Sequence, residues 1–191
     1  RAKLYKEKGE PPQAAAALEE ALQTVFARRA VGGSPSELVV ALVEIYETDM
    51  KDVAKARDLL DRICNQWVYE FKQADDLADC YAAWVEMELR QESWDSALDI
   101  IRSSVVVPPS TKERPVPRMV KGLSKTLRLW DLLLDLEESL GTIQTTKDAY
   151  NQAIEKRVAT SLHILNFATY LTEQNYFEES FAAYERGIEL F

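Results

Sequence analysis

Few side chains in this sequence could do chemistry, and none has the surroundings that a catalytic group requires. His163 is the only histidine, so a Ser-His-Asp or Cys-His mechanism would have to use it. It stands among polar residues where a helix is expected to begin, and we expect a surface or cap-adjacent role. Glu137 and Glu138 could suggest a general acid and base, but adjacent helical residues point about 100° apart. We expect Glu137 to accept a hydrogen bond or ion pair from a neighbouring helix and Glu138 to be solvated.

The two cysteines also give no sign of a reactive site. Cys64 and Cys80 are too few and too far apart for a disulfide framework or a zinc site. We expect both to be small buried hydrophobic residues in a reducing compartment. The sequence contains no Gly-rich phosphate loop, paired cysteine ligands or HExxH run. We therefore expect no catalytic residue, no cofactor and no metal, and the chain is not expected to be an enzyme.

Six basic residues lie close together in a chain that is otherwise acidic. The net charge is −9, which argues against a surface devoted to nucleic acid, because phosphate contacts need clustered Lys and Arg. Between Ser110 and Arg128, however, six basic residues accompany the single acid Glu113, giving +5 there and −14 elsewhere. We call these six residues the basic cluster: Lys112, Arg114, Arg118, Lys121, Lys125 and Arg128.

The spacing within the basic cluster favours a contact surface. Lys121, Lys125 and Arg128 follow one another at offsets of four and three, which places them on one face of a single helix. The other three members fall in the loop that leads to this helix. We expect this face to contact RNA phosphate or an acidic patch on a partner. The alternative is a solvated loop whose charge only balances its acidic neighbours.

The four tryptophans fall into two groups. Trp84 and Trp130 lie on a repeated apolar stripe and are expected in the core. Trp67 and Trp94 lie outside this stripe, near the ends of the expected helical hairpins. These two are the candidates for aromatic residues that face a partner.

One hydrophobic pattern, which occurs four times, determines how these residues are positioned. In each copy three apolar residues are followed, twenty residues later, by two more. The copies are Val39, Leu42, Val43 with Leu59, Ile63; Tyr81, Trp84, Val85 with Ile101, Val105; Trp130, Leu133, Leu134 with Tyr150, Ile154; and Ile164, Phe167, Ala168 with Tyr184, Ile188. Hairpins of this size bury their apolar faces by stacking on neighbours. The pattern predicts an all-α fold, a right-handed α-solenoid of antiparallel helical hairpins, that acts by binding.

We expect one array over residues 1–191. It consists of a partial repeat at 1–30, repeats at 35–65 and 76–106, a basic and proline-rich loop at 107–117, and repeats at 118–157 and 161–191. Ser34 and Pro35 supply a helix cap and a first-turn proline, and Ser93 and Thr142 are expected to cap later helices. The first helix of the third full repeat is expected to run unbroken over residues 118–140.

Composition supports a folded binding protein. Apolar residues make up 47% of the 191 positions and only six are glycine, which excludes a disordered chain. No stretch approaches the roughly 20 apolar residues that span a membrane, and no signal peptide opens the sequence. Both ends are expected to be cut through a longer array.

Longer motifs resemble a known family. The segments 129–141 with Ala149-Tyr150, and 181–188, resemble the half-a-TPR (HAT) repeat of RNA-processing proteins, with a glutamate late in each first helix (Glu47, Glu88, Glu137 and Glu173). The segments 21–25, 71–78, 135–142, 157–160 and 176–191 are similar, in the same order, to the larger crooked-neck-like splicing scaffolds, which in animals bind XPA. Together these motifs cover nearly all of the chain. Val39, at the usual Trp position, and Met50, where Gly or Asn is common, depart from the repeat.

The resemblance implies a non-catalytic protein–protein interaction scaffold of the spliceosome. It implies nuclear localisation and partners among the NineTeen-associated factors and an intron-binding helicase complex, with no membrane or small-molecule substrate. Two other classes stay open from the residues alone. A TPR-like peptide-binding adaptor would need an ordered row of Lys, Arg and Asn along its inner helices, which is not apparent. A non-catalytic helical-repeat subunit of an enzyme complex would need a partner that carries the active site.

Overall fold

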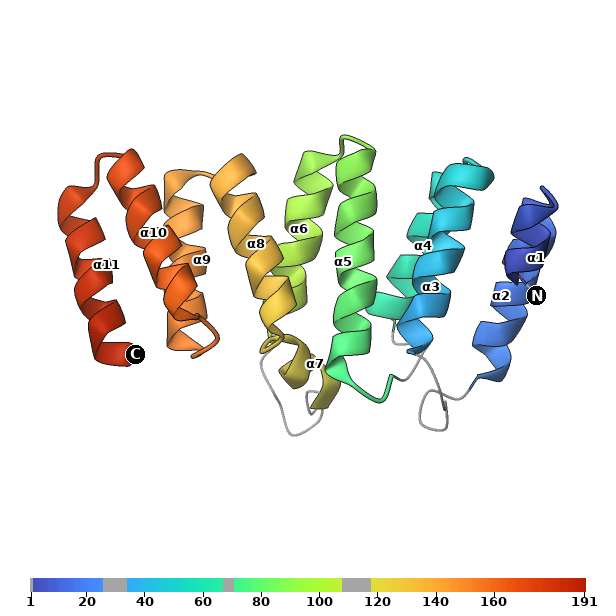
Figure 1. Cartoon of the computed structure of the whole chain (residues 1–191), viewed down its shortest axis with the longest axis horizontal. Coiled ribbons are helices and arrows are strands. Elements are labelled where there is room, and N and C mark those ends of the chain that lie inside the picture. The colour runs from blue at the N-terminus through green and yellow to red at the C-terminus, as the bar shows by residue number, and fades with distance from the viewer. Residues whose placement is uncertain (1, 26–33, 67–70, 108–117) are drawn as a thin grey trace. The chain divides into compact units, whose positions relative to one another are not determined.

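The computed structural model describes the chain except residues 1, 26–33, 67–70 and 108–117 (Figure 1). Every regular element in the described residues is a helix, which confirms the predicted all-α fold of helical hairpins. The chain divides into two compact units, Arg1–Leu123 and Ser124–Phe191, which we call unit 1 and unit 2. None of the helices described is both long and apolar enough to cross a membrane.

The described residues of unit 1 form three pairs of helices and one short helix. Its elements are α1 (Ala2–Glu7), α2 (Pro11–Thr24), α3 (Pro35–Glu44), the π-helical turn η2 (Ile45–Asp49), α4 (Val53–Cys64), α5 (Ala74–Arg90), α6 (Trp94–Val105) and α7 (Arg118–Leu123). Because η2 continues α3 directly, the first helix of this repeat ends at Asp49. Helix α5 packs against α3, α4, α6 and α7.

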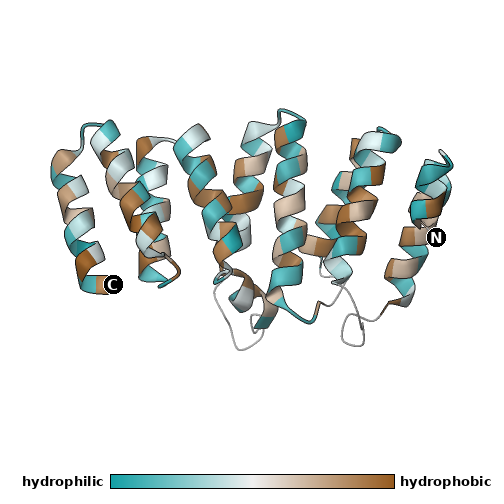
Figure 2. Ribbon diagram, viewed as in Figure 1, coloured by the Kyte–Doolittle hydropathy of each residue, from teal (hydrophilic) through white to brown (hydrophobic). Residues whose placement is uncertain are grey.

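Unit 2 contains two helical hairpins. Its helices are α8 (Leu127–Leu140), α9 (Ile143–Glu155), α10 (Ser161–Glu173) and α11 (Phe177–Leu190). Figure 2 shows apolar and polar residues alternating along these helices, as expected where one face of each helix is buried. Trp130 and Tyr150 are among the largest fully buried side chains, and the Tyr150 ring stacks on Phe167 of α10 with 4.6 Å between ring centroids.

The helix starts follow the capping residues read from the sequence, with one exception. The Ser34 hydroxyl accepts a hydrogen bond from the Ser36 N–H at 3.2 Å, and Thr142 forms a reciprocal capping box with Thr145. Ser93 precedes α6 but makes no side-chain cap. Its hydroxyl instead accepts a bond from Arg57 Nη2 at 3.4 Å, so the prediction that it caps α6 was wrong.

The turns inside most hairpins use a residue with left-handed backbone conformation. The φ angles are 71° at Gly9, 54° at Lys51, 57° at Glu92 and 65° at Asn175. A residue other than glycine is strained at these positive φ angles, and Asn tolerates them better than Lys or Glu. The turn between α8 and α9 differs, because Gly141 there has an ordinary φ of −77°.

The helix predicted over residues 118–140 is broken into α7 and α8. Helix α7 ends at Leu123 and α8 begins at Leu127. The Ser124 carbonyl accepts a hydrogen bond from the Trp130 indole N–H at 2.9 Å. It accepts this side-chain bond in place of a backbone hydrogen bond of a continuous helix. Gly122 lies just before the break, where a Cβ atom would come within 2.8 Å of the Ala74 Cβ. The prediction of one unbroken helix was therefore wrong.

Candidate functional site

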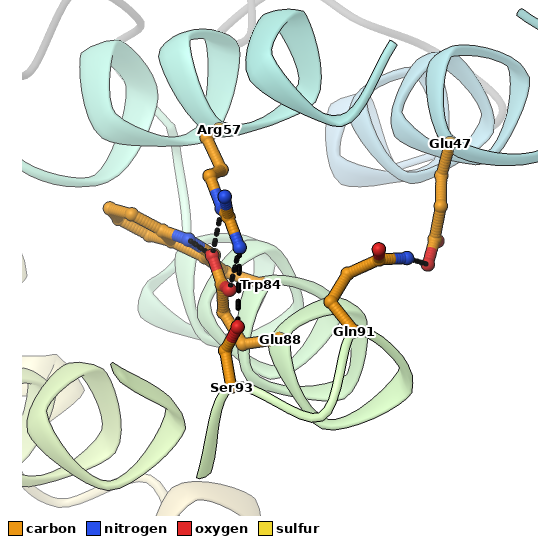
Figure 3. A network of polar contacts seen from close by, with 6 residues as sticks. All are labelled: Glu47, Arg57, Trp84, Glu88, Gln91 and Ser93. Atoms are coloured by element: carbon orange, nitrogen blue, oxygen red, sulfur yellow. Dashed lines mark hydrogen bonds and ion pairs between the residues drawn. The ribbon is translucent and has the colours of Figure 1, made fainter. Parts of the chain in front are cut away.

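The late-helix glutamate Glu88 joins two hairpins of unit 1. Arg57 of α4 donates from Nε to Glu88 Oε1 at 2.8 Å and from Nη2 to Oε2 at 2.6 Å (Figure 3). The Trp84 indole N–H donates to Glu88 Oε1 at 3.3 Å. The Glu88 side chain is only 3% exposed, whereas that of Arg57 is 46% exposed. This carboxylate is held as a buried acceptor, which favours a structural role over acid–base chemistry.

Glu47, at the end of the preceding first helix, is held in the same manner. Arg90 Nη2 donates to Glu47 Oε2 at 2.7 Å, and Gln91 Nε2 donates to Oε1 at 3.1 Å (Figure 3). The hydrogen bond from Arg90 is the main cause that holds the pKa of Glu47 below its usual value, against the opposing effect of burial. Two charged contacts therefore clamp α5 to the hairpin that precedes it.

In unit 2 the corresponding glutamates differ in burial. Glu137 is buried, and a Cβ atom at Gly141 would come within 2.3 Å of its Oε2 atom. Glu138 is exposed as predicted, yet it also accepts a hydrogen bond from the Tyr150 hydroxyl. Glu173 is exposed. Glu137 and Glu138 thus have separate environments, which agrees with the argument against an acid–base pair.

His163 is part of a helix cap and is buried. Its Nδ1 accepts a hydrogen bond from the Thr160 N–H at 3.2 Å, and the Thr160 hydroxyl accepts one from the His163 N–H at 3.3 Å. His163 Nε2 lies 2.7 Å from Asp131 Oδ1 on α8. The cap-adjacent role is confirmed, and the alternative of a surface position was wrong. His163 therefore caps α10 through Nδ1 and joins α10 to α8 through Nε2.

The two thiols lie in the core of unit 1. Cys64 and Cys80 are both fully buried. Burial raises the pKa of each thiol, so that neither forms the reactive thiolate near neutral pH. Their expected role as small buried hydrophobic residues is confirmed. Within the residues that the structure covers, no group of His, Cys, Asp and Glu side chains could hold a metal ion.

The basic cluster is exposed where it is described, but not on one helical face. Arg118, Lys121, Lys125 and Arg128 are all exposed, whereas Lys112 and Arg114 lie outside the described residues. The break between α7 and α8 falls between Lys121 and Lys125. The prediction that offsets of four and three put Lys121, Lys125 and Arg128 on one helix face was therefore wrong. Their expected contact with an anionic partner stays a prediction.

The structure confirms the core position of the two tryptophans predicted there, whereas the partner contact expected of the other two stays a prediction. Trp84 and Trp130 are buried. Trp94 begins α6 and is 48% exposed, so it is available to a partner. Trp67 lies outside the described residues.

Sequence reasoning missed an exposed apolar stripe on α11. The stripe consists of Phe177, Phe181, Tyr184 and Ile188, of which Ile188 is 82% exposed. Tyr184 and Ile188 were predicted as core residues of the fourth copy, and this was wrong. The equivalent residues of α9, Tyr150 and Ile154, are buried, with Tyr150 stacked on Phe167 of the following hairpin. The repeat spacing marks the apolar stripe but does not say whether another element covers it.

Comparison with known proteins identifies a family. The family described as Pre-mRNA-splicing factor Syf1/CRNKL1 C-terminal HAT repeat matches residues 27–191. The chain is 41% identical over 188 residues to the Pre-mRNA-splicing factor SYF1 of Homo sapiens, with 96% of this chain and 21% of that protein covered. It is 34% identical over 193 residues to the Pre-mRNA-splicing factor syf1 homolog of Drosophila melanogaster, with 100% of this chain and 21% of that protein covered. It is 34% identical over 163 residues to the Pre-mRNA-splicing factor cwf3 of Schizosaccharomyces pombe, with 83% of this chain and 20% of that protein covered. The chain spans about a fifth of the length of these relatives.

Proposed function

Because this chain belongs to the C-terminal HAT-repeat family of the Syf1/CRNKL1 pre-mRNA-splicing factors, we propose that it is a non-catalytic protein–protein interaction scaffold in pre-mRNA splicing. The family match over residues 27–191 carries this proposal. The contacts of the polar side chains support it. Glu47, Glu88 and His163 each join one helix to another, which suits residues that maintain a binding surface.

The proposed partners are spliceosomal proteins. The proposed localisation of this protein is the nucleus. The resemblance of the motifs suggests the NineTeen-associated factors and an intron-binding helicase complex. We propose the array as one series of repeats at 1–30, 35–65, 76–106, 118–157 and 161–191, with a basic loop at 107–117. Helical repeats of this kind bind partners over an extended surface. The segment would therefore contribute one part of a longer binding surface.

Two exposed features are the proposed points of contact. Trp94 offers a large aromatic surface, the kind of residue that contributes strongly to protein interfaces. The described members of the basic cluster lie within eleven consecutive residues and are all exposed, which suits RNA phosphate or an acidic protein surface. Residues Lys112 and Arg114 extend this group in the sequence.

The partner set is tested by affinity purification of the tagged full-length protein from nuclear extract, with and without ribonuclease. Recovery of splicing factors in both samples is expected for a scaffold held by protein contacts. Loss of these factors on ribonuclease treatment would mean that RNA holds them. Recovery of chaperones or an enzyme partner, without splicing factors, would contradict the proposal.

The basic cluster is tested by charge reversal. Replacing Lys121, Lys125 and Arg128 with Glu should weaken the association, and the association of the wild-type protein should weaken as salt is raised. The matched control reverses three exposed lysines outside the basic cluster: Lys3, Lys8 and Lys72. Equal effects of both triple substitutions, or binding that does not respond to salt, would reject the basic cluster as a contact.

A further inference from the structure

A polar contact joins the first turn of α3 to α5. The Ser34 hydroxyl donates a hydrogen bond to the Asp76 carboxylate of α5. The Ser36 hydroxyl, which is buried, donates to Asp79 Oδ2 at 3.2 Å and lies 2.6 Å from the Ser34 hydroxyl. Two serine hydroxyls on one helix therefore satisfy two carboxylates on the other. The contact depends on the proton that Ser34 supplies to Asp76.

Ser34 is also the residue before Pro35, and this Ser-Pro pair is the sequence that proline-directed protein kinases modify. Ser34 is half-buried and Pro35 is buried. A kinase can therefore reach the pair only when the first turn of α3 opens. Helix ends open locally at a much lower free-energy cost than global unfolding. The opened first turn is thus the state that a kinase would modify.

We propose that Ser34 is a phosphorylation site for a proline-directed kinase, and that its phosphate releases the first turn of α3 from Asp76 and Asp79 of α5. In the reaction Ser34 Oγ attacks the γ-phosphorus of ATP. The new bond joins Oγ to phosphorus, the bond to the β-phosphate oxygen breaks, ADP leaves, and the hydroxyl proton passes to the kinase. The product can no longer donate a proton to Asp76.

The charges decide the direction of the effect. A phosphoserine carries a charge of about −1.5 to −2 at neutral pH, and this charge would stand beside two carboxylates that now contact serine hydroxyls. The start of α3 attracts an anion, but its effective charge is only about +0.5. Repulsion from Asp76 and Asp79 therefore outweighs the attraction of the helix, and the phosphate holds the first turn open after the kinase leaves.

Phosphate incorporation is the first test. The 191-residue chain is treated with ATP and a proline-directed kinase, and the modified residue is identified by mass spectrometry. We expect phosphate on Ser34 and its loss in the Ser34→Ala and Pro35→Ala variants. Modification that spares Ser34, or that persists at Ser34 in Pro35→Ala, would overturn the assignment of the site.

The structural effect is tested by melting and hydrogen exchange. Phosphorylation of the wild-type chain should lower the melting temperature by about 4 °C and speed amide exchange in α3, with exchange in α9 unchanged. In the Asp76→Asn/Asp79→Asn variant the side-chain amides can donate to the phosphate, so phosphorylation should leave melting unchanged or raise it. An equal decrease in both proteins would overturn the role of the carboxylates. If the double variant does not fold, Asp76→Asn alone makes the same comparison, with the decrease expected to be smaller than in wild type.

Discussion

Removing Arg57 tests whether the contacts of the late-helix glutamates hold the hairpins of unit 1 together. In Arg57→Ala the Glu88 carboxylate, with its side chain only 3% exposed, retains the Trp84 indole N–H at 3.3 Å. Breaking a buried ion pair from one side costs about 3 to 5 kcal/mol. Because the Arg57 side chain is 46% exposed, water can reach the carboxylate once the guanidinium is gone. We therefore expect a loss of about 2 to 3 kcal/mol in the free energy of unfolding.

Urea unfolding followed by circular dichroism measures this loss. The matched control is Arg62→Ala on the same helix, because Arg62 pairs with Asp58 at 3.1 Å while both side chains are at least half exposed. That pair should contribute no more than about 0.5 kcal/mol. Glu88→Gln removes the buried charge and should cost less than Arg57→Ala. If Arg57→Ala cost no more than Arg62→Ala, the reasoning from burial would be refuted.

Three further predictions concern other parts of the chain. The pKa of Glu47 is lowered in the folded state, so the stability that this residue contributes is full above its unfolded-state pKa and is lost as the pH falls through the lowered value. Urea unfolding between about pH 5 and pH 3 should show this loss, and Glu47→Gln should reduce the pH dependence; an unchanged slope would contradict it. Glu92 has a φ of 57°, so replacing it with Gly should raise the free energy of unfolding by about 0.5 to 1 kcal/mol, as measured by thermal melting. Replacement with Ala should not, since only Gly relieves the backbone strain. Gly187→Ala should cost about 1 to 3 kcal/mol because its Cβ would lie 2.7 Å from Ile164 Cγ2, and Ile164→Leu, which lacks that methyl group, should recover part of the loss in the same melting assay; no recovery would argue against this clash.

The features that the sequence specified well are those with a local physical cause. Ser34 and Thr142 mark helix starts because a side-chain oxygen there satisfies a backbone N–H group. Trp84 and Trp130 could be assigned to the core because they fall on a stripe with helical period. Capping and periodicity both act within a few residues, so one sequence contains their signal.

The features that were missed depend on contacts between segments. The helix breaks after Leu123, where the Trp130 indole N–H donates a hydrogen bond to the Ser124 carbonyl. No local sequence pattern indicates this bond. The exposure of Tyr184 depends on whether another element covers α11, and its apolar character is the same in either case. Ser93 has a favourable capping residue type, yet Arg57 engages its hydroxyl instead. In each case tertiary structure decided between options that were equal by local propensity.

The most direct test of the central claim is capture of spliceosomal proteins by the folded chain itself. The 191-residue chain is immobilised and incubated with ribonuclease-treated nuclear extract, and the bound proteins are identified by mass spectrometry. The control is Trp130→Asp, which places a charge at a fully buried position and should unfold unit 2. A scaffold predicts that splicing factors bind to the folded chain and are lost or much reduced with the control. Equal recovery with both chains, or no splicing factor with either, would contradict the proposal that this folded segment binds spliceosomal proteins directly.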